Sequence, residues 1–316
     1  MTAMGMRHVY GPVFSRRLGR SLGLDLVPFK TCTYDCIYCQ LGRTTNLTSH
    51  REEYVPLDEV LAETERKLTA GPAPEFISLA GSGEPTLHSR IGELIAGIKR
   101  MSRIPVAVIT NGSLLWQHEV QEELMAADVV MPSLDAGDAN LFRLVNRPVK
   151  EIEFERMVEG LAGFRRRYAG KVWLEVMVLA GMTGLPREVE KIAELVRVIG
   201  PDRVHFNTVS RPPAEEFAEA VSAARMRSLA RLLPGEVEVV SENGGVQTGA
   251  GEDPEVSDDE ILALVSRRPC TVQGVADGLR LHPHQAAKRL ERLTRDGRVR
   301  PVRRELLTFY ESVGEK

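Results

Sequence analysis

Between residues 22 and 240, short apolar runs alternate with longer amphipathic ones, and this alternation restricts the fold more than any other feature of the chain. Short apolar runs rich in β-branched residues are typical of buried strands, whereas apolar residues three or four positions apart are typical of helices. Strands that alternate with helices form a parallel sheet covered by helices, so we expect an α/β fold. The expected strands are 22–29, 75–81, 106–110, 129–135, 172–180 and 204–210, and the expected helices are 57–70, 88–101, 117–126, 153–168, 185–199 and 214–232.

Periodicity alone leaves two architectures open, an open doubly wound sheet and a partial (β/α)6 barrel. In both, the functional loops leave the carboxyl ends of the strands. Chemically distinctive residues lie at those positions here. Three cysteines follow the first expected strand, the segment GSGEP (81–85) follows the second, and Asn111 with Gly112 follows the third. We therefore expect one site at this edge of the sheet.

The segment FKTCTYDCIYCQLG (29–42) holds three of the four cysteines, Cys32, Cys36 and Cys39. A structural zinc ion needs four ligands, and only His50 lies nearby downstream, so zinc is the weaker hypothesis. A ferredoxin-type cluster also uses four thiolates, at other spacings. Three thiolates suit a four-iron cluster whose fourth iron has no protein ligand and can bind a small molecule.

The CxxxCxxC spacing, with Tyr38 before the last cysteine, resembles the cluster loop of the radical S-adenosylmethionine (SAM) enzymes. The resemblance implies a partial (β/α)6 barrel and two cofactors, a 4Fe-4S cluster and SAM, whose amino and carboxylate groups bind the open iron. It also implies a 5′-deoxyadenosyl radical that abstracts hydrogen from a substrate. An electron donor such as ferredoxin or flavodoxin is the expected redox partner.

GSGEP is similar to the glycine-rich GGEP segment of that superfamily, whose backbone binds the methionyl ammonium of SAM. Taken alone, GSGEP is equally typical of a strand-to-helix turn. Polar residues at later strand ends resemble contacts to SAM, although a satisfied core amide explains Asn207 as well, and Glu175 could instead point outward. The expected SAM contacts are Tyr38, Gly81, Ser82, Gly83, Glu84, Pro85, Asn111, Ser133, Asp135, Glu175 and Asn207, and no catalytic side chain is identified.

Over residues 10–210 the sequence further resembles the group that includes the wyosine-synthesising tRNA enzymes. The similar segments are 10–45, SLAGSGEPTLH (78–88) and VAVITNGSLL (106–115). Those enzymes hold a second iron–sulfur cluster on cysteines upstream of the SAM loop, whereas this sequence has no cysteine before Cys32. We therefore expect a shared scaffold rather than wyosine synthesis itself.

The composition changes after residue 240. Residues 241–256 are rich in glycine and acids, which is typical of a linker. Beyond them come a helix, two short helices joined by a turn, and a hairpin, the pattern of a winged helix-turn-helix. We expect a radical SAM domain over 1–240, a linker over 241–256 and a winged helix-turn-helix domain over 257–316.

From Arg267 to Arg304 the chain has eleven Lys or Arg and three acids, although the formal net charge of the whole is −3. Such a patch is typical of nucleic-acid binding, and a docking module for protein is the alternative. We expect capping or turn roles for His282 and His284, and a buried position for Cys270. The expected contacts to RNA or DNA are Lys288, Arg289, Arg292, Arg295 and Arg303.

The leading functional hypothesis is a radical SAM oxidoreductase whose substrate is a macromolecule, with a tRNA base favoured. The alternatives are a radical SAM enzyme that modifies or activates a peptide or protein, and an iron–sulfur redox sensor that binds DNA. Structural zinc is the last of them. No apolar run approaches the ~20 residues that cross a bilayer, and no signal peptide is evident, so we expect a cytoplasmic protein without membrane contact.

Overall fold

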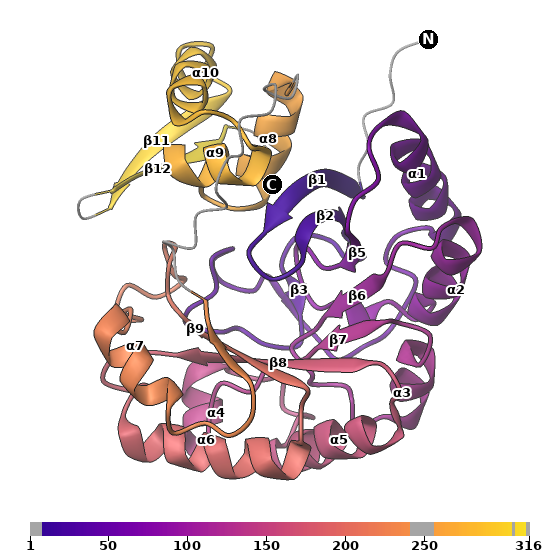
Figure 1. Ribbon diagram of the computed structural model, residues 1–316, viewed down its shortest axis with the longest axis vertical. Helices are drawn as coiled ribbons and strands as arrows, with labels where there is room; N and C mark the ends of the chain where they lie inside the picture. Colours follow the sequence, from indigo (N-terminus) through magenta and orange to yellow (C-terminus); the bar gives the residue numbers. More distant parts are fainter. Residues whose placement is uncertain (1–7, 241–255, 305–306, 314–316) are drawn as a thin grey trace.

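A computed structural model describes residues 8–240, 256–304 and 307–313, and its centre is an eight-stranded sheet (Figure 1). β1 and β2 form an antiparallel hairpin, and every other neighbouring pair of strands is parallel. In spatial order the strands are β1 (Val9–Ser15), β2 (Gly19–Leu24), β5 (Phe76–Leu79), β6 (Val106–Ile109), β7 (Val129–Met131), β8 (Lys171–Val178), β9 (Arg203–Thr208) and β10 (Val237–Val239).

The strand order follows the chain order without a reversal. A doubly wound sheet reverses its strand order at a switch point, so that alternative is wrong. All six expected parallel strands are present, although each is shorter than predicted. Two edge strands were missed, because β1 is the outer arm of a hairpin and β10 has only three residues.

The helices cover the outer face of the sheet (Figure 1). α6 illustrates why they form. Pro186 occupies its first turn, where a missing N–H costs nothing, and Gly200 ends it with a left-handed φ of 66°. The helices of this part are α1 (Leu57–Ala70), α2 (Ile91–Met101), α3 (His118–Leu124), α4 (Ala139–Val145), α5 (Phe154–Arg167), α6 (Pro186–Ile199) and α7 (Ala223–Ala230), with a 3-10 turn, η1, at Pro85–Leu87.

Strand β8 shows how the sheet separates the core from the site. Its residues alternate, so Val172, Leu174, Val176 and Val178 are buried in the hydrophobic core. Glu175 and Met177 stand on the other face and line a cavity. The alternation of one strand therefore supplies both the core and the site.

Residues 256–304 and 307–313 form a separate core of their own, which we call the C-terminal module. Ser257 and Glu260 make a capping box at its first helix. Two smaller expectations are confirmed: His282 caps a helix by accepting from the His284 N–H, and Cys270 is buried. The elements are α8 (Asp258–Arg267), α9 (Val272–Leu279), α10 (Pro283–Arg295) and the antiparallel pair β11 (Val299–Arg304) and β12 (Leu307–Ser312), and the predicted linker, apart from residue 256, lies outside the described residues.

The C-terminal module packs on the hairpin at the edge of the sheet, with α8 and α9 next to β1 (Figure 1). The Arg267 guanidinium lies 4.2 Å from the ring centre of Tyr10, and that of Arg280 lies 3.7 Å from the ring centre of Phe14. Val13 adds an apolar contact to the core of the module. Cation–π pairs of this kind contribute about 0.5–2 kcal/mol each.

Among the described helices, none has the length and apolar character that a membrane-spanning segment needs.

Candidate active site

Cys32 is the last residue of β3 (Thr31–Cys32), a short strand paired with β4 (Asn46–Leu47), and Cys36 and Cys39 lie on the loop that follows. All three are half-buried. Backbone hydrogen bonds fix the loop: the Ile37 N–H donates to the Val145 carbonyl at 2.9 Å, and the Cys39 N–H donates to the Cys36 carbonyl at 3.1 Å. The loop is thus anchored to the end of α4, far away in sequence.

Each cysteine sulfur accepts a hydrogen bond from a nitrogen of another side chain. Lys30 Nζ lies 3.1 Å from Cys39 Sγ, Asn111 Nδ2 lies 3.6 Å from Cys32 Sγ, and Asn146 Nδ2 lies 3.5 Å from Cys36 Sγ. Donors to sulfur stabilise thiolates and tune the potential of an iron–sulfur cluster. The donor set therefore suits a cluster held by these three residues.

Burial favours the neutral form of two of the three thiols, Cys32 and Cys36. Burial, and then the nearby Glu84 carboxylate, raise the pKa of Cys32 to about 12. Burial, followed by the Asp135 carboxylate and the other two thiols, also raises the pKa of Cys36 well above its ordinary value. Since metal ligation requires thiolates, loading of this site releases protons.

The arrangement does not suit a single metal ion. In residues 8–240, 256–304 and 307–313, no three His, Cys, Asp or Glu side chains are grouped as ligands around one ion. Zinc needs every ligand about 2–2.3 Å from one point, whereas in a 4Fe-4S cluster each thiolate binds a different iron. The cysteines therefore give no support to the zinc hypothesis.

The segment GSGEP packs directly against the cluster loop. The Lys30 N–H donates to the Ser82 carbonyl at 2.7 Å, and the Glu84 N–H donates to the Thr31 carbonyl at 3.1 Å. A Cβ at Gly83 would lie 1.8 Å from the Thr31 carbonyl oxygen, so only glycine allows this approach. Ser82 is buried, and both its N–H and its hydroxyl donate to Asp25.

The Glu84 side chain has a structural role. Its buried carboxylate accepts from Thr86 N at 3.0 Å, Thr110 Oγ1 at 2.6 Å and Asn111 N at 2.7 Å. These bonds join the ends of β5 and β6, and burial raises the pKa of Glu84. Pro85 is buried as the first residue of η1. A role for these two residues in SAM binding stays a prediction.

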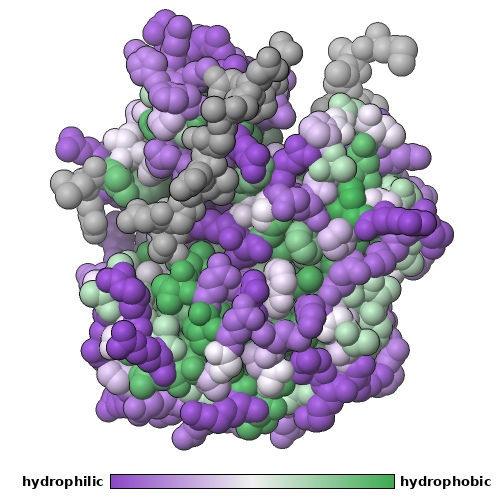
Figure 2. Space-filling model, viewed as in Figure 1, coloured by the Kyte–Doolittle hydropathy of each residue, from purple (hydrophilic) through white to green (hydrophobic). Residues whose placement is uncertain are grey.

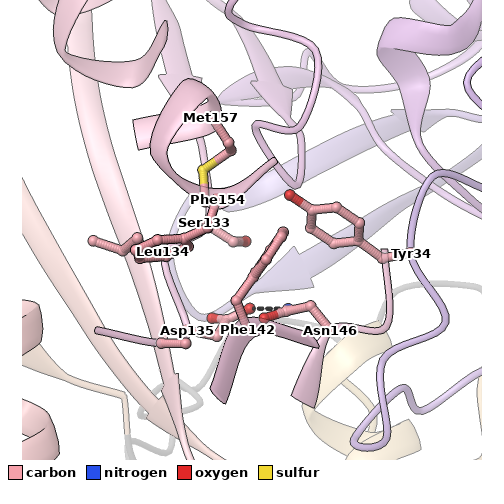
Figure 3. A pocket seen from close by; sticks show the side chains of 9 residues that line it. Tyr34, Ser133, Leu134, Asp135, Phe142, Asn146, Phe154 and Met157 are labelled. Atoms are coloured by element: carbon pink, nitrogen blue, oxygen red, sulfur yellow. Dashed lines mark hydrogen bonds between the residues drawn. The ribbon is translucent and has the colours of Figure 1, made fainter. Parts of the chain in front are cut away.

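Asp135 connects the cluster loop to β7 and β8. Its carboxylate accepts from the Tyr38 hydroxyl at 2.5 Å, Asn146 Nδ2 at 2.8 Å and Met177 N at 3.0 Å. Figure 3 shows the bond to Asn146 beneath the rings of Tyr34 and Phe142. Ser133 lines the same tightly packed niche, which is too small for a water molecule. The sequence analysis missed Asn146, since nothing near it in sequence marks it.

A cavity of about 430 Å³ opens at the carboxyl ends of the strands, within the usual range of about 300–1,000 Å³ for ligand sites. Among its walls are six residues expected at the site: Tyr38, Cys39, Gly81, Gly83, Glu175 and Asn207. The other expected residues are not among the residues that line this cavity. They are Cys32, Cys36, Ser82, Glu84, Pro85, Asn111, Ser133 and Asp135.

Two parts of the cavity wall were missed by the sequence analysis. Arg17, in the turn of the β1–β2 hairpin, forms an ion pair with Glu175, which thus faces the cavity rather than outward solvent. Arg267 and Arg268, at the end of α8, also line the cavity. No local motif marks these arginines, because the tertiary fold alone brings them to the site.

The predicted nucleic-acid contacts divide into paired and unpaired residues. Arg292 and Arg289 pair with Asp258 at 2.5 and 3.8 Å, and Arg295 pairs with Glu291 at 3.8 Å. Lys288 and Arg303 are exposed and have no ion-pair partner in the described part of the chain. Figure 2 shows a mainly hydrophilic outer face on α10. Binding of RNA or DNA here stays a prediction.

Comparisons with known proteins identify the family of the chain. The model of the radical SAM superfamily matches residues 26–198. A UPF0026 protein of Helicobacter pylori (strain J99) is 31% identical, covering 96% of each chain. A Brachyspira hyodysenteriae protein named GTPase Obg is 38% identical over 93% of this chain, which spans only 43% of that relative.

Among solved structures, a radical SAM methyltransferase from Sphaerobacter thermophilus shares the fold. It aligns with a TM-score of 0.53 at 18% identity, covering 69% of this chain and 65% of that one. The family match spans both the cysteine loop and the glycine segment that meet at the cavity. The chain belongs to the radical SAM superfamily and, within it, to the UPF0026 proteins, and it is an enzyme whose cofactors are a 4Fe-4S cluster and SAM.

Proposed function

We propose that this enzyme reductively cleaves SAM and uses the resulting radical to abstract hydrogen from a substrate bound in the 430 Å³ cavity. One observation carries the proposal: Cys39 of the cluster loop and the backbone of Gly81 and Gly83 line the same cavity. In domain terms, residues 1–240 form a partial (β/α)6 barrel, 241–256 a linker and 257–316 a winged helix-turn-helix.

A 4Fe-4S cluster held by Cys32, Cys36 and Cys39 would supply the electron for the reductive cleavage of SAM. Ferredoxin or flavodoxin is the proposed source of that electron. The chain's own residues hold and orient the reactants. Lys30, Asn111 and Asn146 donate to the three sulfurs. Gly81 and Gly83 let Asp25 and the Thr31 carbonyl pack against the glycine segment, which holds its backbone at the cavity wall.

The test uses full-length protein purified without oxygen and reconstituted with iron and sulfide. With dithionite and SAM, the wild type should give 5′-deoxyadenosine, and the Cys32→Ala, Cys36→Ala, Cys39→Ala variant should give none. Cys270→Ala is the matched control, since Cys270 lies in the C-terminal module. A wild-type cluster whose electron paramagnetic resonance signal does not change on addition of SAM would overturn the proposal.

A second candidate function, recognition of RNA or DNA by the C-terminal module, is favoured by the two unpaired cations Lys288 and Arg303. A tRNA base remains the favoured substrate in that case. The Lys288→Gln, Arg303→Gln variant should bind a transfer RNA more weakly and with a reduced salt dependence, because phosphate contacts release counterions. Arg292→Gln is the control, since Asp258 already pairs with Arg292. An equal loss of transfer RNA affinity in the two variants would contradict recognition of RNA by Lys288 and Arg303.

A further inference from the structure

The cavity has an uneven charge distribution. Within the described residues, its walls include five arginines and one carboxylate, Glu175. The arginines come from three distant segments. Arg16 and Arg17 lie in the β1–β2 turn, Arg211 follows β9, and Arg267 with Arg268 ends α8. Bringing like charges from three segments together lowers the stability of the fold, because the charges repel one another. A ligand of opposite charge in the site would relieve this repulsion.

Contacts among the described residues balance part of this charge. Arg17 pairs with Glu175, and Arg211 donates to Gln40 Oε1 at 2.8 Å. Arg267 lies against the Tyr10 ring and donates through Nη1 to the Ala263 carbonyl at 3.3 Å. Its Nε is buried without an acceptor.

Arg268 is poorly compensated by the described residues. Its Nε is buried and has no acceptor, and its side chain has no ion pair with any described residue. Burial, and then the charges of Arg268 and Arg16, lower the pKa of Arg17 to about 10, so Arg268 lies close enough to oppose the charge of Arg17. The C-terminal end of α8 offsets some of this repulsion through the helix dipole.

The fold holds Arg268 at this place. Leu264 and Val265 anchor the end of α8 in the core of the C-terminal module. Two residues after Arg268, the backbone of Cys270 pairs with that of Tyr310, at 2.8 and 3.2 Å. The backbone on both sides of Arg268 is therefore held next to the cavity that its side chain lines.

SAM does not account for these arginines. Its sulfonium and ammonium groups outweigh its single carboxylate, so SAM brings net positive charge into a cavity that already has an excess of it. The thiolate-bound cluster would bring negative charge at Cys39, but the arginines still outnumber the acidic groups among the described lining residues, so a strongly anionic second molecule suits the cavity. Guanidinium groups bind phosphate through paired N–H donors, and a phosphate monoester carries close to two negative charges near neutral pH.

We infer that the substrate carries a phosphate group, which binds at the mouth of the cavity between Arg267 and Arg268 of α8 and the arginines of the β1–β2 turn. This inference deepens the proposed function, because it assigns the substrate class of the same site. It also makes the C-terminal module part of the active site. The phosphate belongs either to a small molecule or to an RNA, and the two are distinguished by experiment.

The test measures binding by isothermal titration calorimetry on the reconstituted full-length protein, without reductant. GTP and inorganic pyrophosphate should bind, whereas guanosine, which matches GTP but lacks phosphate, should not. Arg268→Gln should weaken binding at least about tenfold, the usual effect of losing a charged hydrogen-bond donor, and Arg268→Lys should lose less. Arg197→Gln, on the exposed face of α6, is the matched control and should bind as the wild type does.

A 5′-phosphorylated RNA oligonucleotide forms the second arm. If the RNA binds with the same dependence on Arg268 and GTP does not, the phosphate is that of an RNA substrate. If no phosphate-bearing probe binds, or if Arg268→Gln binds as the wild type does, the inference is wrong. Iron content and circular dichroism of Arg268→Gln establish that it has folded. The binding experiment involves no SAM cleavage. A lack of phosphate binding is therefore a separate result from a lack of 5′-deoxyadenosine, which would count against the proposed function.

Discussion

The Tyr38 hydroxyl donates a hydrogen bond to Asp135 Oδ2 at 2.5 Å, and this contact joins the cluster loop to the segment after β7. Tyr38 is next to Cys39, and it lines the cavity. Burial is the main cause that raises the pKa of both groups. The residue preceding the last cysteine thus also fixes the position of the loop.

Removal of that hydroxyl should loosen the loop. Tyr38→Phe leaves Asp135 with two of its three donors, so the free energy of unfolding should fall by about 1–2 kcal/mol in urea titrations. Tyr54→Phe is the control, because the Tyr54 hydroxyl donates to the His50 carbonyl at an exposed site, and it should cost much less. Equal costs for the two variants would contradict the anchoring role of Tyr38.

The close approach of Gly83 to β3 can be tested with a single methyl group. In Gly83→Ala the added Cβ meets the Thr31 carbonyl oxygen at 1.8 Å, so β3 and the adjacent Cys32 must shift. We expect a loss of iron bound after reconstitution. Gly71→Ala introduces the same group where nothing lies within 4 Å, and it should leave the iron content unchanged. A normal iron content in Gly83→Ala would show that β3 and the cluster loop can accommodate the added methyl group without losing the cluster.

Glu84 should contribute to stability through its hydrogen bonds. Glu84→Gln keeps the size of the side chain but replaces one acceptor oxygen with an NH₂ group, which faces donors from Thr86, Thr110 and Asn111. We expect a loss of about 1–3 kcal/mol in the free energy of unfolding. Glu190→Gln, at an exposed position of α6, should have no measurable effect. Comparable midpoints in urea for both variants would refute the structural role of Glu84.

His205, fully buried in β9, predicts a dependence of stability on pH. Burial, and then the charges of Arg17 and Arg203, lower its pKa to about 4. The unfolded chain, with an ordinary pKa of about 6.5, binds more protons between these values, so stability falls as the pH drops through that window. The full loss is about 3 kcal/mol, reduced by the Glu238 carboxylate 3.5 Å from Nε2.

The measurement compares urea unfolding of the wild type and His205→Phe between pH 7 and pH 4.5. Other groups titrate in both proteins, so the difference between the two curves reports His205 alone. The wild type should lose more stability than the variant as the pH falls. Parallel curves would mean that His205 already binds a proton in the folded protein.

Much of the fold and part of the candidate site could be predicted from local sequence patterns. The strand–helix alternation determined the α/β fold, because a periodicity of two or of about 3.6 residues is set by neighbouring residues along the chain. The spacing of Cys32, Cys36 and Cys39 likewise predicted the kind of cluster, since three ligands on one short loop need no distant partner. The six expected parallel strands are present because their pattern is likewise set by neighbouring residues along the chain.

The tertiary structure decided what depends on contacts between distant segments. It set the strand order, the pairing of Arg17 with Glu175, and the place of Asn146 between Cys36 and Asp135. It also brought Arg268 to the cavity, although the sequence placed the C-terminal module apart from the site. Contacts such as Asn146 with Cys36 and Arg17 with Glu175 leave no periodic or local trace, because they arise only when segments far apart in the sequence pack together.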